Sequence, residues 1–212
     1  MNIQKKEFEW RSPLKPLNLK KVTAIALHHM EHLTAGMDEI HQWHLARDNG
    51  TWKGFGYNFW IDFAGNVFEC RGFNKGAGVT DMNSTVISIG FQGHYDKTEE
   101  MPPAQFLAGC ELINYLKSIV PSIKLVAGHR YWENKSCPGK YFPLEEMIKM
   151  ADTISRIKDY DKIADWAKSS VMNVVNEGIM IGDEQGQFNP TVPLTRQEVA
   201  VVLDRLLQKI KS

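Results

Sequence analysis

The sequence has no excess of either charge, because 25 lysines and arginines balance 25 aspartates and glutamates. A protein that binds nucleic acid usually carries a basic excess or a basic patch, so this class is disfavoured. Cysteine is also scarce: Cys70, Cys110 and Cys137 form an odd, low count. A disulfide scaffold is therefore not expected. We interpret Cys70 and Cys110 as small buried apolar residues.

Long hydrophobic runs are absent as well. No segment approaches the roughly 20 apolar residues that span a membrane, and residues 1–11 contain no apolar stretch of the length that a secretory signal needs. We therefore expect that the chain does not insert into a membrane and that it is made as a soluble cytosolic protein. A length of 212 residues accommodates one core domain with a smaller second unit.

Apolar and β-branched runs alternate with helical periodicity over the first three quarters of the chain. Strands are predicted at residues 22–27, 85–91 and 124–127, and residues 57–69 predict a hairpin around a Gly-Asn turn. Helices are predicted at residues 38–47, from Pro102-Pro103 to about residue 119, and from residue 143 onward. In the first helix we expect Ile40 and Trp43, with Leu45 as a further candidate, to face inward. The pattern predicts an α/β fold with a mixed central sheet flanked by helices.

A polar stretch at residues 155–162 marks a predicted boundary, which divides the chain into residues 1–157 and residues 161–212. The second part predicts a small all-α module with two amphipathic helices. Gly178 is placed to cap the first helix, and Thr195 with Glu198 forms a capping box before the second. Two such helices bury only a thin core, so we expect the module to pack on the first domain or on a copy of itself.

Histidine and cysteine recur where a metal site needs them. His129 follows a predicted strand, Cys137 lies further along the same loop, and His28 and His29 end another strand. Imidazole nitrogen and thiolate sulfur suit tetrahedral Zn²⁺, and three protein ligands with one open position are typical of catalytic zinc. Adjacent strand residues point to opposite faces, so only one of His28 and His29 can reach the ion, and spacing alone does not choose between them.

Several ordered motifs over about residues 20–155 resemble the zinc-dependent N-acetylmuramoyl-L-alanine amidases, a family that includes T7-like phage lysozymes and peptidoglycan recognition proteins. The motifs are Ile25-Ala26-Leu27-His28-His29-Met30, Glu39-Ile40-His41-Gln42-Trp43-His44, Gly56-Tyr57-Asn58-Phe59, Ile87-Ser88-Ile89-Gly90, Gly128-His129-Arg130 and Lys135-Ser136-Cys137-Pro138.

The resemblance implies a Zn²⁺ held by His28, His129 and Cys137, which selects His28 over its neighbour. It also implies catalytic roles for Tyr57 and Lys135. As a hypothesis, the metal activates water and polarises the scissile carbonyl, Lys135 stabilises the oxyanion, and Tyr57 orients the water or the intermediate. The implied substrate is peptidoglycan, cut between N-acetylmuramic acid and L-alanine.

The chain departs from its relatives in the loop after the hairpin. Many relatives carry a histidine there, whereas this chain has Gly76-Ala77-Gly78. The contact that the histidine makes must come from elsewhere or be absent. His94 and His44 are candidates to replace it, although each is more readily interpreted as an exposed or structural histidine.

The last part of the chain resembles the S-layer homology motif, a unit that binds secondary cell-wall polysaccharide and often occurs as three copies. The matching segments are Asp165-Trp166-Ala167, Gly178-Ile179-Met180-Ile181-Gly182, Gly186-Gln187-Phe188-Asn189-Pro190 and Leu194-Thr195-Arg196-Gln197-Glu198. We expect wall contacts at Trp166 and at Arg196, whose forked guanidinium suits the acid groups of an anionic glycan. The alternative for Arg196 is that it pairs with Glu198 or faces solvent. Only one copy is present, so either the chain forms a homo-oligomer or the motif is a packing element.

These observations predict a cell-wall amidase with a small wall-binding or oligomerisation module. A wall-directed enzyme without a signal peptide fits a phage or prophage endolysin of a Gram-positive host, made in the host cytoplasm and released to the wall through holin lesions. The alternatives are a cytosolic muropeptide-recycling amidase, which has little use for a wall-binding tail, and a peptidoglycan-binding receptor without catalysis. Binding-only relatives commonly lack the cysteine ligand, and Cys137 is present.

Overall fold

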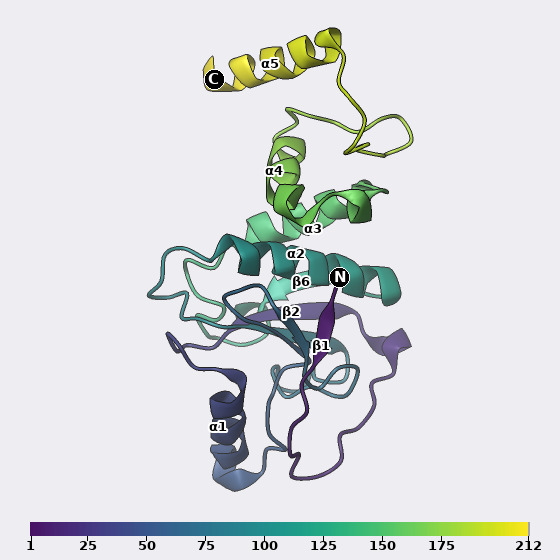
Figure 1. Cartoon of the computed structure of the whole chain (residues 1–212). Helices are drawn as coiled ribbons and strands as arrows, with labels where there is room; N and C mark the ends of the chain where they lie inside the picture. The colour runs from purple at the N-terminus through teal and green to yellow at the C-terminus, as the bar shows by residue number, and fades with distance from the viewer. Residues whose placement is uncertain (212) are drawn as a thin grey trace. The chain divides into compact units, whose positions relative to one another are not determined.

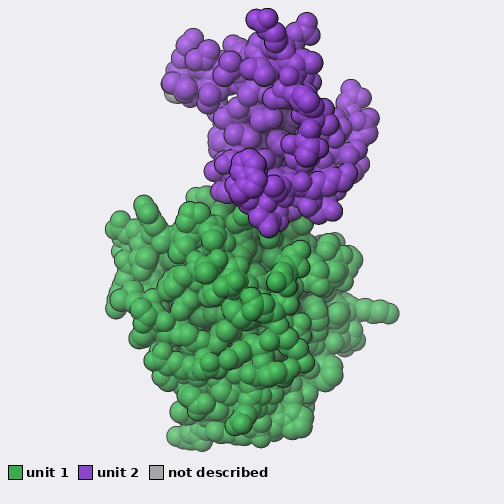
Figure 2. Space-filling model, viewed as in Figure 1, with its two compact units in different colours: residues 1–148 green, residues 149–212 purple. Residues whose placement is uncertain are grey.

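The computed structural model describes residues 1–211 of the chain. The chain forms two compact units, Met1–Ile148 and Lys149–Ser212 (Figure 2). The division between the units falls inside a helix, α3 (Leu144–Arg156). The functional division into residues 1–157 and 161–212 stays a prediction.

The first unit is built on a six-stranded sheet with the strand order β1-β4-β3-β5-β2-β6. Strands β3 and β4 form the predicted antiparallel hairpin, and all other neighbouring strands are parallel. This mixed sheet confirms the predicted α/β fold class. The edge strand β1, at the start of the chain, was not predicted. The strand bounds are β1 (Ile3–Lys5), β2 (Ala24–His29), β3 (Phe59–Ile61), β4 (Val67–Glu69), β5 (Val86–Phe91) and β6 (Leu125–Gly128).

Strand β2 occupies the centre of the parallel part of the sheet, between β5 and β6. All six of its residues are buried, as expected for a parallel strand that is covered on both faces. Its last residues, His28 and His29, pair in register with Gly90 and Phe91 of β5. Polar side chains are therefore delivered to the carboxyl end of a strand whose earlier residues are apolar.

Helices cover both faces of the sheet: α2 (Pro103–Ile119) runs along one face, and α1 (Met37–Gly50) lies on the other side (Figure 1). The glycine at position 109 lets α2 approach the sheet, because a Cβ there would lie 2.9 Å from Phe91 Cε1 and 2.8 Å from Met147 Sδ. A Cβ at Gly90 would meet the rings of Tyr57 and Trp60 instead. Successive residues of β5 therefore face the two helical layers in turn.

The burial of α1 differs from the prediction. Ile40 is fully buried as expected, but Trp43 is 40% exposed and Leu45 is only partly buried. The helix buries His41 and His44 in their place. These two histidines are tolerated in the core because each accepts a backbone N–H, from Phe55 and Gly56 respectively.

The second unit contains α4 (Asp165–Asn176) and α5 (Arg196–Lys211), which confirms a helical module. Gly178 has a φ of +66° and ends α4 as predicted. The capping box also forms: the Thr195 N–H donates to Glu198 Oε2 at 2.7 Å, and the Glu198 N–H donates to Thr195 Oγ1 at 3.2 Å. Most apolar residues of α5 remain exposed, and none of its described residues is buried. No helix within residues 1–211 is long and apolar enough to cross a membrane.

Candidate metal centre

Three of the predicted site residues meet at one end of the sheet. His28 is the second-to-last residue of β2, His129 follows β6, and Cys137 lies on the loop beyond it. One ligand atom from each residue lies within 4.8 Å of the others. Cys137 Sγ is 3.8 Å from His28 Nδ1, and the two imidazole ring centres are 4.5 Å apart. All three side chains are buried.

The parallel register explains this convergence. Leu27 of β2 pairs with Gly128 of β6, so His28 and His129 leave neighbouring strands at the same level. The carboxyl ends of parallel strands are where ligands bind in open α/β sheets. Gly128 has room for no side chain, because a Cβ there would lie 2.5 Å from Pro138 Cδ. The missing side chain lets the Cys137 loop fold closely over the strand end.

The alternation along β2 separates the two adjacent histidines. The His28 ring centre lies 5.0 Å from that of Tyr57, whereas His29 accepts the Tyr95 N–H through Nδ1 at 2.9 Å on the other side. Only His28 joins His129 and Cys137 in the three-ligand group. The structure therefore places His28, and not His29, beside His129 and Cys137.

Burial controls the charge state of this group. Desolvation and the neighbouring His129 hold the pKa of His28 well below its usual value, and burial raises the pKa of the Cys137 thiol to about 12. A divalent cation would displace the thiol proton of Cys137, and it would take the lone pair of the neutral imidazole that burial already favours at His28. Two nitrogens and one sulfur in a buried position fit Zn²⁺.

Tyr57 stands beside His28 and is buried. Desolvation raises the pKa of its phenol, with a further contribution from Cys137, so the hydroxyl remains a proton donor. The next residue, Asn58, fixes its position: Nδ2 donates to the carbonyls of Gly72 and Asn74 at 2.7 Å each, and Oδ1 accepts the Ser88 N–H at 2.9 Å. The motif contained Asn58, but its anchoring role was not predicted.

Lys135 contacts a carboxylate that sequence reasoning missed. Its Nζ lies 2.8 Å from Glu133 Oε2, and Glu133 Oε1 lies 2.9 Å from His129 Nε2. The Thr80 N–H also donates to Glu133 Oε1, at 2.8 Å. Burial opposes ionisation of Glu133, but contacts from His129, Lys135 and Thr80 outweigh it and hold its pKa well below the usual range. Its position four residues after His129 was the available signal.

The predicted catalytic residues share one cavity of about 620 Å³. This volume is within the range of small-ligand sites. Its lining includes the three proposed metal ligands together with Tyr57, Glu133 and Lys135. The structure thus brings together every site residue predicted for the first domain.

Gly78 lines the same cavity and has no room for the histidine of the relatives. A Cβ at this position would lie 2.5 Å from Ser88 Oγ and 3.1 Å from His28 Nε2. His44 also lines the cavity, but its Nδ1 accepts the Gly56 N–H at 3.0 Å. This contact agrees with the interpretation of His44 as a structural histidine.

The predicted wall-contact residues occupy the starts of two helices in the second unit. Trp166 on α4 is 88% exposed, and Arg196 is the exposed first residue of α5. Neither lines the cavity of about 430 Å³ within this unit. The Glu198 carboxylate is engaged by Thr195.

Comparisons with known proteins agree with this geometry. The family model for N-acetylmuramoyl-L-alanine amidase matches residues 18–140, and that for the S-layer homology domain matches residues 156–200. Peptidoglycan-recognition protein SC2 of Drosophila melanogaster is 33% identical over 153 residues, which cover 65% of this chain and 79% of that protein. The surface-layer 125 kDa protein of Lysinibacillus sphaericus is 33% identical over 54 residues, covering 26% of this chain and 5% of that protein.

A solved structure shares the fold. The endolysin N-acetylmuramoyl-L-alanine amidase LysCS from Clostridium intestinale superposes with a TM-score of 0.62 at 24% identity, covering 69% of this chain and 92% of that one. The peptidoglycan recognition protein SA of the bumblebee superposes with a TM-score of 0.59 at 22% identity, covering 69% and 93%. The family match spans more than half of the sequence. The chain belongs to the N-acetylmuramoyl-L-alanine amidase family and carries an S-layer homology domain in its C-terminal part.

Proposed function

We propose that this chain is a zinc-dependent hydrolase that cuts the amide between N-acetylmuramic acid and L-alanine in peptidoglycan. The observation that carries the proposal is the meeting of His28, His129 and Cys137, whose ligand atoms lie within 4.8 Å of one another. Family membership supports the substrate class. The surrounding cavity gives the substrate access to the three residues.

The three residues would hold Zn²⁺ and leave a fourth position open, as in catalytic zinc sites. The bound metal would supply a Lewis acid for the scissile carbonyl and lower the pKa of a coordinated water. The buried surroundings of His28 and Cys137 keep bulk water from competing for these ligands.

Two further side chains act on the developing charge. The Lys135 side chain is 44% exposed and lines the cavity. Its ammonium is suited to stabilise the oxyanion of the tetrahedral intermediate. The phenol of Tyr57 keeps its proton and can donate a hydrogen bond to the water or the intermediate. The contacts of Glu133 with His129, Lys135 and Thr80 favour its ionised form, so its carboxylate is better suited to orient His129 and Lys135 than to donate a proton.

The test is digestion of purified Gram-positive walls with the intact protein, with a chelator and after zinc is restored. We expect turbidity to fall and new N-terminal alanine to appear on the released peptides, both abolished by the chelator and recovered with zinc. Wall binding without new N-terminal alanine would instead support a peptidoglycan-binding protein without catalysis. The similarity to a peptidoglycan-recognition protein raises this alternative. Cys137 supports the hydrolase, because it completes the three-ligand set.

We further propose that the protein acts as a phage or prophage endolysin, supported by the shared fold with LysCS. The S-layer homology domain supports retention at secondary cell-wall polysaccharide, through Trp166 and Arg196. A cytosolic muropeptide-recycling role has no evident use for that domain. The comparisons give no support to the homo-oligomer, and we do not propose it. The endolysin role is tested by adding the protein to host cells from outside and by expressing it inside them. We expect added protein to lyse the cells and expressed protein to lyse them only after the membrane is permeabilised.

A further inference from the structure

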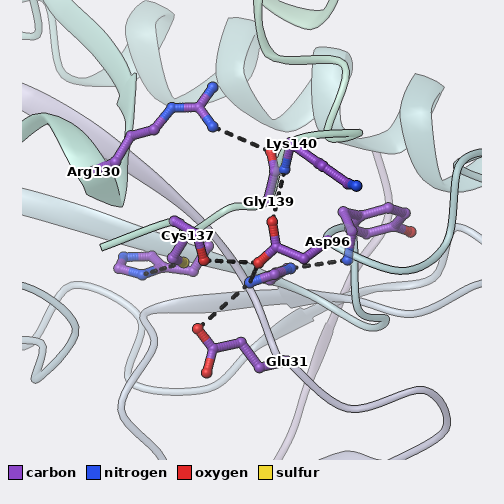
Figure 3. Close-up of polar contacts among 10 residues, drawn as sticks. Glu31, Asp96, Arg130, Cys137, Gly139 and Lys140 are labelled. Atoms are coloured by element: carbon purple, nitrogen blue, oxygen red, sulfur yellow. Dashed lines mark hydrogen bonds and ion pairs between the residues drawn. The ribbon is translucent and has the colours of Figure 1, made fainter. Parts of the chain in front are cut away.

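A carboxylate outside the three-ligand group holds both sides of the Cys137 loop. Asp96 follows β5, and its Oδ2 accepts a hydrogen bond from the Ser136 hydroxyl at 2.7 Å. Its Oδ1 accepts the Lys140 N–H at 2.9 Å. The two donors flank Cys137 in the sequence, so one side chain fixes the loop before and after the sulfur (Figure 3).

The opposite side of the loop is held by Arg130, the residue after His129. Its backbone N–H donates to the Cys137 carbonyl at 2.8 Å, and its Nη1 donates to the Gly139 carbonyl at 3.2 Å (Figure 3). The distance between the proposed ligands His129 and Cys137 is therefore set by contacts on two sides, from Arg130 and from Asp96.

Close backbone packing brings the Asp96 segment to the loop. Gly139 has a φ of +105°, and a Cβ there would lie 2.4 Å from the Tyr95 carbonyl carbon. The Tyr141 N–H donates to the Tyr95 carbonyl at 2.8 Å. A side chain at position 139 would push the loop away from Asp96.

The same segment also holds the end of β2. The Tyr95 N–H donates to His29 Nδ1, so neutral His29 carries its proton on Nε2, which faces Glu31 at 3.7 Å and Asp96 at 3.9 Å. His29, His94 and Asp96 are close enough to form a second metal group. A protonated Nε2 has no lone pair for a metal, so this group is better explained as a structural contact between β2 and the loop.

We propose that Asp96 is a positioning residue for the metal centre: it holds the Cys137 loop so that the sulfur stays in place beside His28 and His129. The inference rests on the proposed zinc site. Groups beyond the direct ligands commonly change metal affinity by about 10–100-fold. Asp96 would act through the loop and touches neither the metal nor the substrate.

The test compares Asp96→Ala and Ser136→Ala with the intact wild-type chain in two measurements. The first is zinc affinity by competition with a chromogenic chelator. The second is the rate at which iodoacetamide alkylates Cys137 in the metal-free protein, followed by peptide mass spectrometry. Asp96→Ala should weaken zinc binding about 10–100-fold and speed alkylation of Cys137. Ser136→Ala should move both quantities in the same direction by less, because the Lys140 N–H contact remains.

Asp62→Ala is the matched control. Asp62 also accepts two hydrogen bonds, both from Asn66 in the hairpin turn, and it does not line the cavity. Its loss should leave zinc affinity and alkylation unchanged.

Unchanged affinity and alkylation in a folded Asp96→Ala protein would overturn the role of Asp96. If that variant does not fold, the same unchanged values in Ser136→Ala overturn it, and weaker binding there supports it. If His28→Ala binds zinc as tightly as the wild type, the proposed metal centre itself is rejected.

Discussion

Glu133 joins His129 to Lys135: one carboxylate oxygen lies 2.9 Å from His129 Nε2 and the other 2.8 Å from Lys135 Nζ. A carboxylate beside Nε2 favours the proton on that nitrogen and leaves the lone pair on Nδ1 for a metal. The same carboxylate restrains the ammonium that we propose to stabilise the oxyanion. We therefore infer that Glu133 would link zinc binding at His129 to the placement of Lys135.

Replacing Glu133 by glutamine should weaken both functions. We expect zinc affinity to fall about 10–100-fold and kcat to fall as well, because Lys135 loses its ionic partner. Zinc titration and initial rates on a soluble muropeptide measure the two effects. Glu184→Gln makes the same charge change on an exposed residue of the second unit and should alter neither. If Glu133→Gln has the zinc affinity and kcat of the wild type, Glu133 supports neither function.

Lys135→Ala should separate metal binding from catalysis. Lys135 contacts Glu133 and is not one of the three grouped ligands, so the variant should retain zinc. Losing a donor to the oxyanion typically costs about 100–1,000-fold in kcat. Metal analysis and turnover on the same preparation give the answer, and undiminished hydrolysis would show that Lys135 has no part in the reaction.

Acid should destabilise the first unit through His44. Burial lowers the pKa of His44 to about 4, with the charges of Arg47 and Arg71 adding to the effect. In the unfolded chain, the pKa of His44 is about 6.5. Between about pH 6.5 and about pH 4, the unfolded chain therefore carries a proton on His44 that the folded chain lacks. The free energy of unfolding should therefore fall as pH falls through this window, by about 1.4 kcal/mol per pH unit from this one group.

His44→Asn tests this assignment, because asparagine keeps an acceptor near the position of Nδ1 and does not titrate. Urea unfolding between pH 4 and 7 should show a shallower pH dependence for the variant than for the wild type. An identical slope for the two proteins would mean that His44 is not the titrating group.

Gly78→Ala should disturb the site without adding a functional group. The new Cβ would lie 2.5 Å from Ser88 Oγ and 3.1 Å from His28 Nε2. Overpacking of this kind typically costs about 1–3 kcal/mol, and a displaced His28 would also bind zinc more weakly. Adding Ser88→Ala removes the closer of the two atoms and should recover part of both losses. If Gly78→Ala matches the wild type in stability and zinc affinity, position 78 has room for a Cβ and the close packing described above is wrong.

Trp166→Ala should affect wall retention and leave catalysis unchanged. The indole is 88% exposed and lies outside the unit that contains the cavity with His28. Loss of an aromatic anchor should weaken wall binding about tenfold (~1.4 kcal/mol). Sedimentation with purified walls measures binding, and hydrolysis of a soluble muropeptide provides the control. Equal sedimentation of the two proteins would exclude Trp166 as a wall contact.

The sequence predicted the features that depend on local pattern. Apolar runs located β2, β5 and β6, and the motifs selected His28, His129 and Cys137, which the structure brings together. The short edge strand β1 escaped notice because its three residues carry too little pattern.

The supporting contacts were beyond prediction because they join residues far apart in the chain. Asp96 meets Ser136 across 40 positions, and no local periodicity records such a pair. In α1, the hydrophobic pattern favoured Trp43 as a buried residue, but backbone N–H groups made His44 acceptable in the core instead.

A defined N-acetylmuramoyl-L-alanyl peptide tests whether the chain is a zinc-dependent amidase, with wild type and Cys137→Ser compared by mass spectrometry and metal analysis. We expect one zinc per wild-type chain and two products, the sugar with its free lactyl carboxylate and the peptide with a free N-terminal alanine. Cys137→Ser should lose most of both zinc and turnover. Cleavage at any other bond, or full turnover by Cys137→Ser without zinc, would show that the chain is not a zinc-dependent amidase acting on this bond.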